Sequence, residues 1–221
     1  MTGAVDLRFV LASSPAVGPL ALALLAAAVE ARGGTVATPV AHPDLVAYVE
    51  AASAPAPADV LVGYSGGGPR LFAVAARLHP RAIVFMDAGL PADGAAPDAD
   101  PAMAAALDSL PLDDNGVLPP WPAWWPESVL EQLCPDAELR SQFAADCPQV
   151  PRMIYAQPIP APPFDGPCAY LALGDVYAAE RQLAESSGWP TATLTRGHLA
   201  PLIAPDEVAV ALIDLAERML G

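Results

Sequence analysis

The sequence predicts an α/β fold, with a mostly parallel sheet, helices on both faces and a helical lid insertion. Between Leu7 and Met86, apolar runs of strand length alternate with helix-length segments in the order βαβαβαβ, which favours a parallel sheet with right-handed crossovers. Hydrophobic residues make up 54% of the 221-residue chain, as expected for a sheet buried on both faces. A glycine-rich turn containing a serine lies between the third strand and its helix. The length fits one domain, residues 1–221.

The elements of the first half follow from their apolar runs and from the residues that interrupt them. Gly33-Gly34 ends the helix predicted over Leu20 to Arg32. Asp44 supports the first turn of a short helix that continues to about Ala52. A third helix, from Leu71 to Leu78, follows the serine turn. The strands predicted in this half are Leu7 to Ala12, Thr35 to Val40, Val60 to Val62 and Arg81 to Met86.

The regular alternation stops after the fourth strand. Residues 92–166 are rich in Pro, Asp and Ala, and we interpret them as an insertion over the strand ends. Helix-like pieces lie near Pro101 to Leu110, Glu127 to Leu133 and Ala137 to Ala145. The sheet then resumes. The remaining predictions are a strand over Cys168 to Leu173, a helix over Val176 to Ser187, a strand over Pro190 to Thr195, a loop over Gly197 to Pro201 and an amphipathic helix over Asp206 to Leu220.

The serine turn carries the clearest chemical signal. The apolar run Val60 to Val62 leads into Gly63-Tyr-Ser-Gly-Gly67, a G-x-S-x-G pattern, and a helix follows. A strand, a sharp turn bearing serine and a helix together form a nucleophile elbow. The glycines leave space for a strained turn, and the helix N-terminus places N–H groups beside the serine oxygen. Ser65 is therefore the candidate nucleophile.

Charge and composition exclude several classes of function. The formal net charge is −15 and the chain contains no lysine, so neither a Schiff-base lysine nor a P-loop lysine is present. Such an acidic chain is unsuited to nucleic acid or an anionic membrane. His42, His79 and His198 lie far apart and lack neighbours at metal-ligand spacing. We expect a small-molecule substrate and no metal or other cofactor, with neither nucleic acid nor a membrane as partner.

The cysteines bear on the compartment. Cys134, Cys147 and Cys168 form no C-x-x-C pair, and an odd number without a signal peptide is typical of a reduced, cytoplasmic protein. The apolar run Leu20 to Val29 is too short to span a membrane and has the wrong flanks for a signal peptide. We therefore expect a cytoplasmic protein.

A stiff aromatic segment stands out within the insertion. Pro119-Pro-Trp-Pro-Ala-Trp-Trp-Pro126 places three tryptophans among four prolines. They either fasten the insertion to the body of the protein by packing or form a lid that lines an apolar pocket. On the second interpretation, Trp121, Trp124 and Trp125 join Tyr64 as the substrate pocket.

These pieces resemble the α/β-hydrolase superfamily over nearly the whole chain. The matching segments are Gly63-Tyr-Ser-Gly-Gly67, the late Gly197-His198 and the helix start Pro205-Asp-Glu-Val208. The chain is similar in particular to the small lidded branch with plant-type methylesterases and haloalkane dehalogenases, which implies a buried pocket between lid and sheet. A serine nucleophile needs a base within hydrogen-bond reach and an acid behind that base. The resemblance implies the chain order nucleophile, acid, histidine, with His198 as the base.

Two aspartates compete for the role of the acid. Asp175 follows the strand after which most of the superfamily carries it. Asp87, in Phe85-Met-Asp-Ala-Gly-Leu-Pro91, resembles the haloalkane dehalogenase segment that places the acid one strand earlier, although those enzymes use an aspartate nucleophile. Either aspartate could instead cap the segment that follows it. We favour Asp87.

The oxyanion hole is expected to use the backbone N–H of Gly66, the residue after the nucleophile. A second donor should come from the loop after the first strand, Ser13-Ser-Pro-Ala-Val17. Pro15 has no N–H, so Ser14 and Ala16 are the candidates.

The sequence therefore predicts a serine hydrolase that cleaves a carboxylic ester or thioester of a mainly apolar small molecule through an acyl-enzyme. The alternative keeps the fold and the pocket without hydrolysis, as a lyase, a cyclase or a small-molecule-binding protein, because fold alone does not decide the chemistry.

Overall fold

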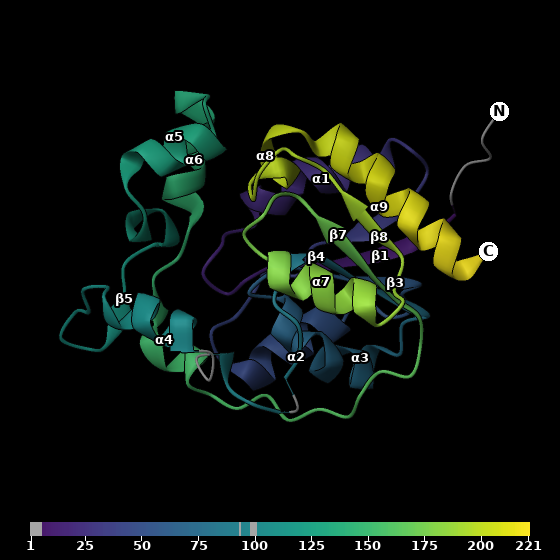
Figure 1. Cartoon of the computed structure of the whole chain (residues 1–221), viewed down its shortest axis with the longest axis horizontal. Coiled ribbons are helices and arrows are strands. Elements are labelled where there is room, and N and C mark those ends of the chain that lie inside the picture. Colours follow the sequence, from purple (N-terminus) through teal and green to yellow (C-terminus); the bar gives the residue numbers. More distant parts are fainter. Residues whose placement is uncertain (1–5, 93, 98–100) are drawn as a thin grey trace.

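The computed structural model describes residues 6–92, 94–97 and 101–221, and its centre is a six-stranded sheet (Figure 1). The strand order is β2-β1-β3-β4-β7-β8, and every neighbouring pair is parallel. The predicted α/β class with a parallel sheet is confirmed. The strands are β1 (Arg8–Ala12), β2 (Thr35–Ala37), β3 (Val60–Ser65), β4 (Ala82–Ala88), β7 (Cys168–Ala172) and β8 (Thr191–Thr193).

Helices cover both faces of the sheet, as Figure 1 shows. One face packs against α1 (Leu20–Glu30), α8 (Ala200–Ile203) and α9 (Pro205–Leu220). The other packs against α2 (Leu45–Ser53), α3 (Leu71–Leu78) and α7 (Ala178–Ser186). The sheet is therefore the middle of three layers, and the open ends of its strands are left for a site.

The strands are apolar on both sides because successive side chains point to opposite faces. Val60 and Val62 of β3 belong to the core under α1 and α9, whereas Leu61 belongs to the core under α2 and α3. All three side chains are fully buried. This two-sided burial explains why the strands appear in the sequence as continuous hydrophobic runs.

The insertion lies between β4 and β7 and is drawn in teal and green on the left of Figure 1. Residues 93 and 98–100 of the predicted insertion lie outside the described part of the chain. Within it, β5 and β6 form a small antiparallel pair. Its elements are α4 (Pro101–Asp108), β5 (Val117–Leu118), η3 (Trp121–Trp124), α5 (Glu127–Leu133), α6 (Ala137–Asp146), β6 (Val150–Pro151) and η4 (Arg152–Tyr155), where η denotes a 3₁₀ helix.

Two kinds of contact hold the insertion against the body. The Asp146 carboxylate accepts a hydrogen bond of 2.7 Å from the Leu20 N–H in the first turn of α1, where a negative charge is favourable. Trp121, Phe143 and Tyr155 are buried in the same core as α1 and α9. The insertion therefore covers the carboxyl ends of the strands.

Several element boundaries differ from the sequence prediction. The second strand stops at Ala37, because Pro39 has no N–H to continue the pairing. The last strand, predicted over Pro190 to Thr195, is shorter and covers only Thr191–Thr193 (β8). The helix α7 begins at Ala178 rather than Val176. The segment after Gly197, predicted as a loop, contains the four-residue helix α8. The two-residue strands β5 and β6 were too short to produce a periodic pattern.

The three cysteines, Cys134, Cys147 and Cys168, are free and buried. None of the helices in the described ranges combines the length and apolarity that a membrane crossing requires.

Candidate active site

Ser65 lies at the tip of a sharp turn between β3 and the helices that follow it, η1 (Gly68–Arg70) and α3. Its φ angle is 55°, a strained value for a residue other than glycine. The neighbouring glycines are required by close packing. A Cβ atom on Gly63 would approach the Leu71 side chain to 2.6 Å, and one on Gly67 would approach the Ala12 carbonyl to 2.4 Å. The turn thus has the geometry of a nucleophile elbow.

Asp87 occupies an irregularity at the end of β4. The pairing of β3 with β4 shifts between Tyr64 and Ser65, so that Ser65 pairs with Ala88 and Asp87 is the extra residue. Its φ angle is 43°, and its side chain is completely buried. The Tyr170 hydroxyl donates to the carbonyl of Ala88 and accepts from its N–H, which fixes the strand end. Such bulges redirect a side chain beside a site.

His198, in the loop between β8 and α8, connects the serine and the aspartate. Its Nδ1 lies 2.7 Å from Oδ2 of Asp87, and its Nε2 lies 3.1 Å from Oγ of Ser65. An ionised carboxylate only accepts hydrogen bonds, so Nδ1 carries the proton and Nε2 is free to accept from the serine hydroxyl. The other oxygen of Asp87 accepts from the Leu173 N–H at 3.0 Å. The three side chains form one hydrogen-bonded line.

Asp175 stands apart from this line. Its side chain is 93% exposed and lies 3.9 Å from the Arg181 guanidinium, and its carbonyl accepts from the Ala178 N–H at the start of α7. The sequence offered two aspartates as candidates for the acid. In the structure Asp87 lies against His198 and Asp175 lies at the surface.

Three aromatic rings surround the imidazole of His198. Tyr64 stacks on it at 5.0 Å between ring centroids, and its hydroxyl donates to the His198 carbonyl at 2.7 Å. Trp121 and Tyr177 each lie 5.9 Å away in tilted orientations. Tyr64 therefore supports the histidine from within the core, whereas Trp121 and Tyr177 reach it from the lid and from the loop after β7.

Tyr177 is the site residue that sequence reasoning missed. Burial raises the pKa of Tyr177 to about 12, and the nearby Ser65 side chain opposes that rise. Its position was the signal that could have identified it: Tyr177 follows Asp175 by two residues, in the loop where most of the α/β-hydrolase superfamily carries its acid.

The loop after β1 lies beside Gly66. Ser14 is buried, and a Cβ atom on Gly66 would approach its Oγ to 2.7 Å. The Ala16 N–H donates to Ser14 Oγ at 3.3 Å, and the Val17 N–H donates to the Ser14 carbonyl at 3.0 Å. Burial raises the pKa of Tyr155 to about 12, and the nearby Ser14 side chain opposes that rise. The Ala16 amide is therefore engaged within its own loop.

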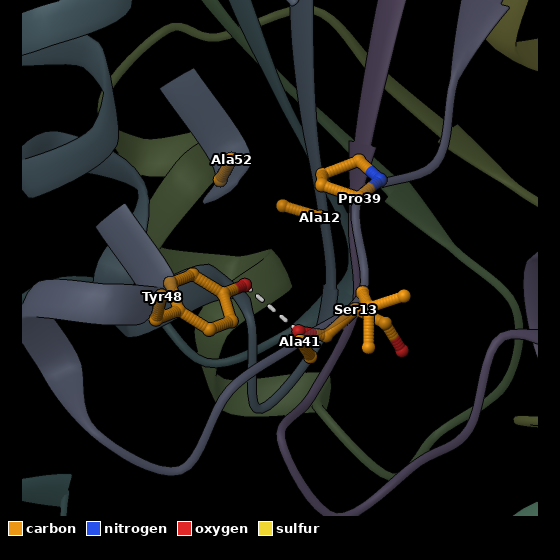
Figure 2. Close-up of a pocket in the computed structure, with 7 residues that line it drawn as sticks. Ala12, Ser13, Pro39, Ala41, Tyr48 and Ala52 are labelled. Carbon is orange, nitrogen blue, oxygen red and sulfur yellow. Dashed lines mark hydrogen bonds between the residues drawn. The ribbon is translucent and has the colours of Figure 1, made fainter. Parts of the chain in front are cut away.

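A small crevice on the α2 side supports the same loop. Figure 2 shows its lining, which includes Ala12, Ser13, Pro39 and Tyr48. The Tyr48 hydroxyl donates to the Ser13 carbonyl at 2.8 Å, the contact dashed in the figure. Neither Ser65 nor His198 lines this crevice. The Tyr48 contact therefore holds the loop after β1 in place and does not touch the reacting groups.

The three tryptophans of the lid have different environments. Trp121 is buried and contacts Phe143 edge-on as well as His198. The Trp124 indole donates to the Pro119 carbonyl at 2.7 Å, and its ring meets Tyr155 edge-on. Trp125 is 43% exposed and contacts Trp121 from outside. Only Trp121 touches the Ser65–His198–Asp87 line.

Within residues 6–92, 94–97 and 101–221, no group of three or more His, Cys, Asp or Glu side chains could hold a metal ion.

Comparison by sequence gives no match, either to a protein-family model or to a curated protein. Solved structures do match. The chain is similar to an extracellular α/β-hydrolase from a Paenibacillus species, described as sharing structural and functional homology with tobacco salicylic acid binding protein 2. The identity is 17%, the TM-score is 0.75, and the match covers 95% of this chain and 99% of that one.

Two other solved structures are similar over the same extent. A pyrethroid hydrolase from Sphingobium faniae has 19% identity and a TM-score of 0.73, with 96% of this chain and 98% of that chain covered. Tomato methylketone synthase I, complexed with 2-tridecanone, has 14% identity and a TM-score of 0.72, with 97% and 99% covered. At such identities the likeness establishes the fold, and the chain has the α/β-hydrolase fold.

Proposed function

We propose that the protein is a serine hydrolase that cleaves a carboxylic ester or thioester of a mainly apolar small molecule. The observation that carries the proposal is the line from Ser65 Oγ to His198 Nε2 at 3.1 Å and from His198 Nδ1 to Asp87 at 2.7 Å. A serine, a histidine and a buried carboxylate in this arrangement are the minimum for nucleophilic acyl transfer.

Each group has a defined role in the proposed reaction. His198 Nε2 takes the Ser65 proton as Oγ attacks the carbonyl carbon, and Asp87 stabilises the resulting imidazolium. The tetrahedral intermediate collapses to an acyl-enzyme while His198 returns the proton to the leaving alcohol or thiol. Water, deprotonated by His198, then attacks the acyl-enzyme. The bond to Ser65 Oγ breaks, His198 returns the proton to Oγ, and the carboxylic acid is released.

The oxyanion donors of the proposed site are the N–H of Gly66 and the N–H of Ser14. Ala16, the other sequence candidate, has its N–H directed to Ser14 Oγ. The Tyr177 hydroxyl stays protonated because its pKa is about 12, and the side chain lies close to both Ser65 and His198.

The surroundings favour an apolar substrate. Trp121 and Tyr177 lie against the imidazole, and Tyr155 lies against the oxyanion loop. Ser65 is 6% exposed and His198 is 5% exposed, so a substrate must displace part of this aromatic cover to reach the nucleophile. Expulsion of water from such a site strengthens its electrostatic interactions.

A fluorophosphonate probe with an alkyl chain tests the proposal. The folded protein should be labelled stoichiometrically, and peptide mass spectrometry should place the label on Ser65. Ser65→Ala should not be labelled, whereas Ser186→Ala, which removes a hydroxyl at the surface end of α7, should be labelled like the wild type. A panel of p-nitrophenyl esters of increasing chain length would then rank the acyl groups.

Absence of labelling in a protein that melts cooperatively would contradict the hydrolase proposal. It would favour the alternative in which the same fold binds a small molecule or performs lyase or cyclase chemistry.

A further inference from the structure

Arg70 is a buried cation directly behind the nucleophile elbow. Its side chain belongs to η1 and the residue is only 3% exposed. No ion pair among the described residues involves it. Burial of an unpaired charge is costly, so the position of this guanidinium requires a physical explanation.

The guanidinium donates to two backbone carbonyls from different parts of the chain. One Nη lies 2.6 Å from the carbonyl oxygen of Gly66, and the other lies 3.3 Å from that of Ile154. Its third partner is the face of the Tyr48 ring, 5.6 Å from the guanidinium carbon. Arg70 therefore connects the elbow, the lid and α2.

Each of these partners adjoins the region where negative charge develops during ester cleavage. Gly66 carries the proposed oxyanion donor in its own backbone. Ile154 precedes Tyr155, whose side chain lies near Ser14, and the Tyr48 hydroxyl donates to the carbonyl of Ser13. The loop has few backbone donors to offer, since Pro15 lacks an N–H and Ala16 uses its own.

We propose that Arg70 is a positioning residue of the oxyanion hole. Its two hydrogen bonds fix the Gly66–Gly67 peptide, which adjoins the peptide that carries the Gly66 N–H, and the lid segment at Ile154. Its unpaired positive charge, in a water-poor interior, favours the anionic tetrahedral intermediate over the neutral ester. The field of a charge is strong where the local dielectric is low. This inference rests on the proposed hydrolase function and specifies how its transition state is stabilised.

The test compares Arg70→Met and Arg70→Lys with Arg77→Met. Arg77 lies on α3 and its side chain is 53% exposed, so its variant removes the same charge from the surface. Each protein is assayed for kcat and KM on p-nitrophenyl butyrate. Each is also titrated with an alkyl trifluoromethyl ketone, which forms an anionic tetrahedral adduct with a reactive serine, and its melting temperature is recorded.

Arg70→Met should lower kcat about 10- to 100-fold, with KM within about twofold of the wild type. This loss is smaller than the roughly 100- to 1,000-fold that follows removal of a direct oxyanion donor, because Arg70 acts through the backbone of Gly66. Ketone affinity should fall by the same factor as kcat, because both report the oxyanion. Arg70→Lys keeps the charge and loses the two-pronged geometry, so it should fall between Arg70→Met and the wild type. Arg77→Met should match the wild type.

A folded Arg70→Met protein with wild-type kcat and ketone affinity would overturn the inference. So would a loss of melting temperature with kcat and ketone affinity unchanged. If Arg70→Met does not fold, Arg70→Lys decides: a parallel fall in kcat and ketone affinity supports the inference, and wild-type values reject it. A wild-type protein that neither cleaves the ester nor reacts with fluorophosphonate at Ser65 would overturn the hydrolase function itself, and this inference with it.

Discussion

The carboxylate of Asp87 lies 2.7 Å from Nδ1 of His198, although 111 residues separate them in the chain. The contact joins the end of β4 to the loop after β8, across the intervening strand β7. The same imidazole reaches Ser65 at the end of β3. The proposed catalytic line therefore lies across the carboxyl ends of the strands, and its three residues come from the ends of β3 and β4 and the loop after β8.

Replacing Asp87 with asparagine should lower kcat by about 10⁴-fold, because an amide at Nδ1 favours the wrong tautomer and cannot stabilise the imidazolium. Asp175→Asn is the matched control, since that carboxylate is exposed and points to Arg181. Its kcat should stay close to that of the wild type. Steady-state kinetics on one ester would reveal a reversed assignment, in which Asp175→Asn is the slow variant.

Ser65→Ala and His198→Ala should each abolish turnover to a similar residual level, because the pair acts as a unit. The double variant should be hardly slower than either single one. Removal of one small hydroxyl should leave the melting temperature of Ser65→Ala within a few degrees of the wild type. Losses that multiply cleanly in the double variant would show that the two residues act independently.

Alanine substitutions should separate the three lid tryptophans. Trp121→Ala should cost about 3–5 kcal/mol of unfolding free energy, as expected for a buried tryptophan, and should also impair catalysis through the lost contact with His198. Trp125→Ala, at a 43% exposed position, should leave stability nearly unchanged and affect KM alone. Urea denaturation and kinetics on the same variants provide the comparison. Equal stability losses at both positions with unaltered kinetics would contradict a pocket role for the segment.

The protein should lose stability in alkaline solution. Burial raises the pKa of Tyr155 and Tyr177 to about 12 and that of Cys147 to about 11. The unfolded chain releases these protons at ordinary pKa values of about 8.5 for cysteine and 10 for tyrosine. The unfolded state then binds fewer protons than the folded state, so the unfolding free energy falls as pH rises.

The expected profile for these three groups is flat below about pH 8 and declines between about pH 8.5 and 12. Urea midpoints measured across that range provide the check. Tyr177→Phe removes one titrating group and should make the decline less steep. A constant unfolding free energy up to pH 11 would show that these hydroxyl and thiol groups are not buried as described.

Local patterns were sufficient to predict much of this protein. Strand positions followed from hydrophobic runs such as Val60 to Val62, because a strand buried on both faces must be apolar throughout. The elbow at Ser65 followed from glycines at fixed spacing between a strand and a helix, and these restrictions are local to the turn. The late position of His198, combined with the family resemblance, was enough to bring it forward as the candidate base.

Only the tertiary structure shows which of Asp87 and Asp175 lies against His198. Both follow parallel strands, so both were expected at the same edge, and their local sequences do not show which side chain points inward. The shift in β3–β4 pairing leaves Asp87 as the extra residue, with a φ angle of 43° and a side chain directed to His198. That shift is a property of two strands packed together.

The roles proposed for Tyr177 and Arg70 likewise depend on folding. Tyr177 lies near Ser65 only because the fold brings the loop after β7 close to the elbow, and Arg70 meets Ile154 only because the lid returns over the elbow. The sequence by itself determined where the strands of the central sheet and its longer helices form and which residues were candidates for the chemistry, because hydrophobic periodicity and turn sterics act over a few neighbouring residues. The partners of those residues were left to the tertiary structure, because hydrogen bonds and buried charges depend on distances between segments that lie far apart along the chain.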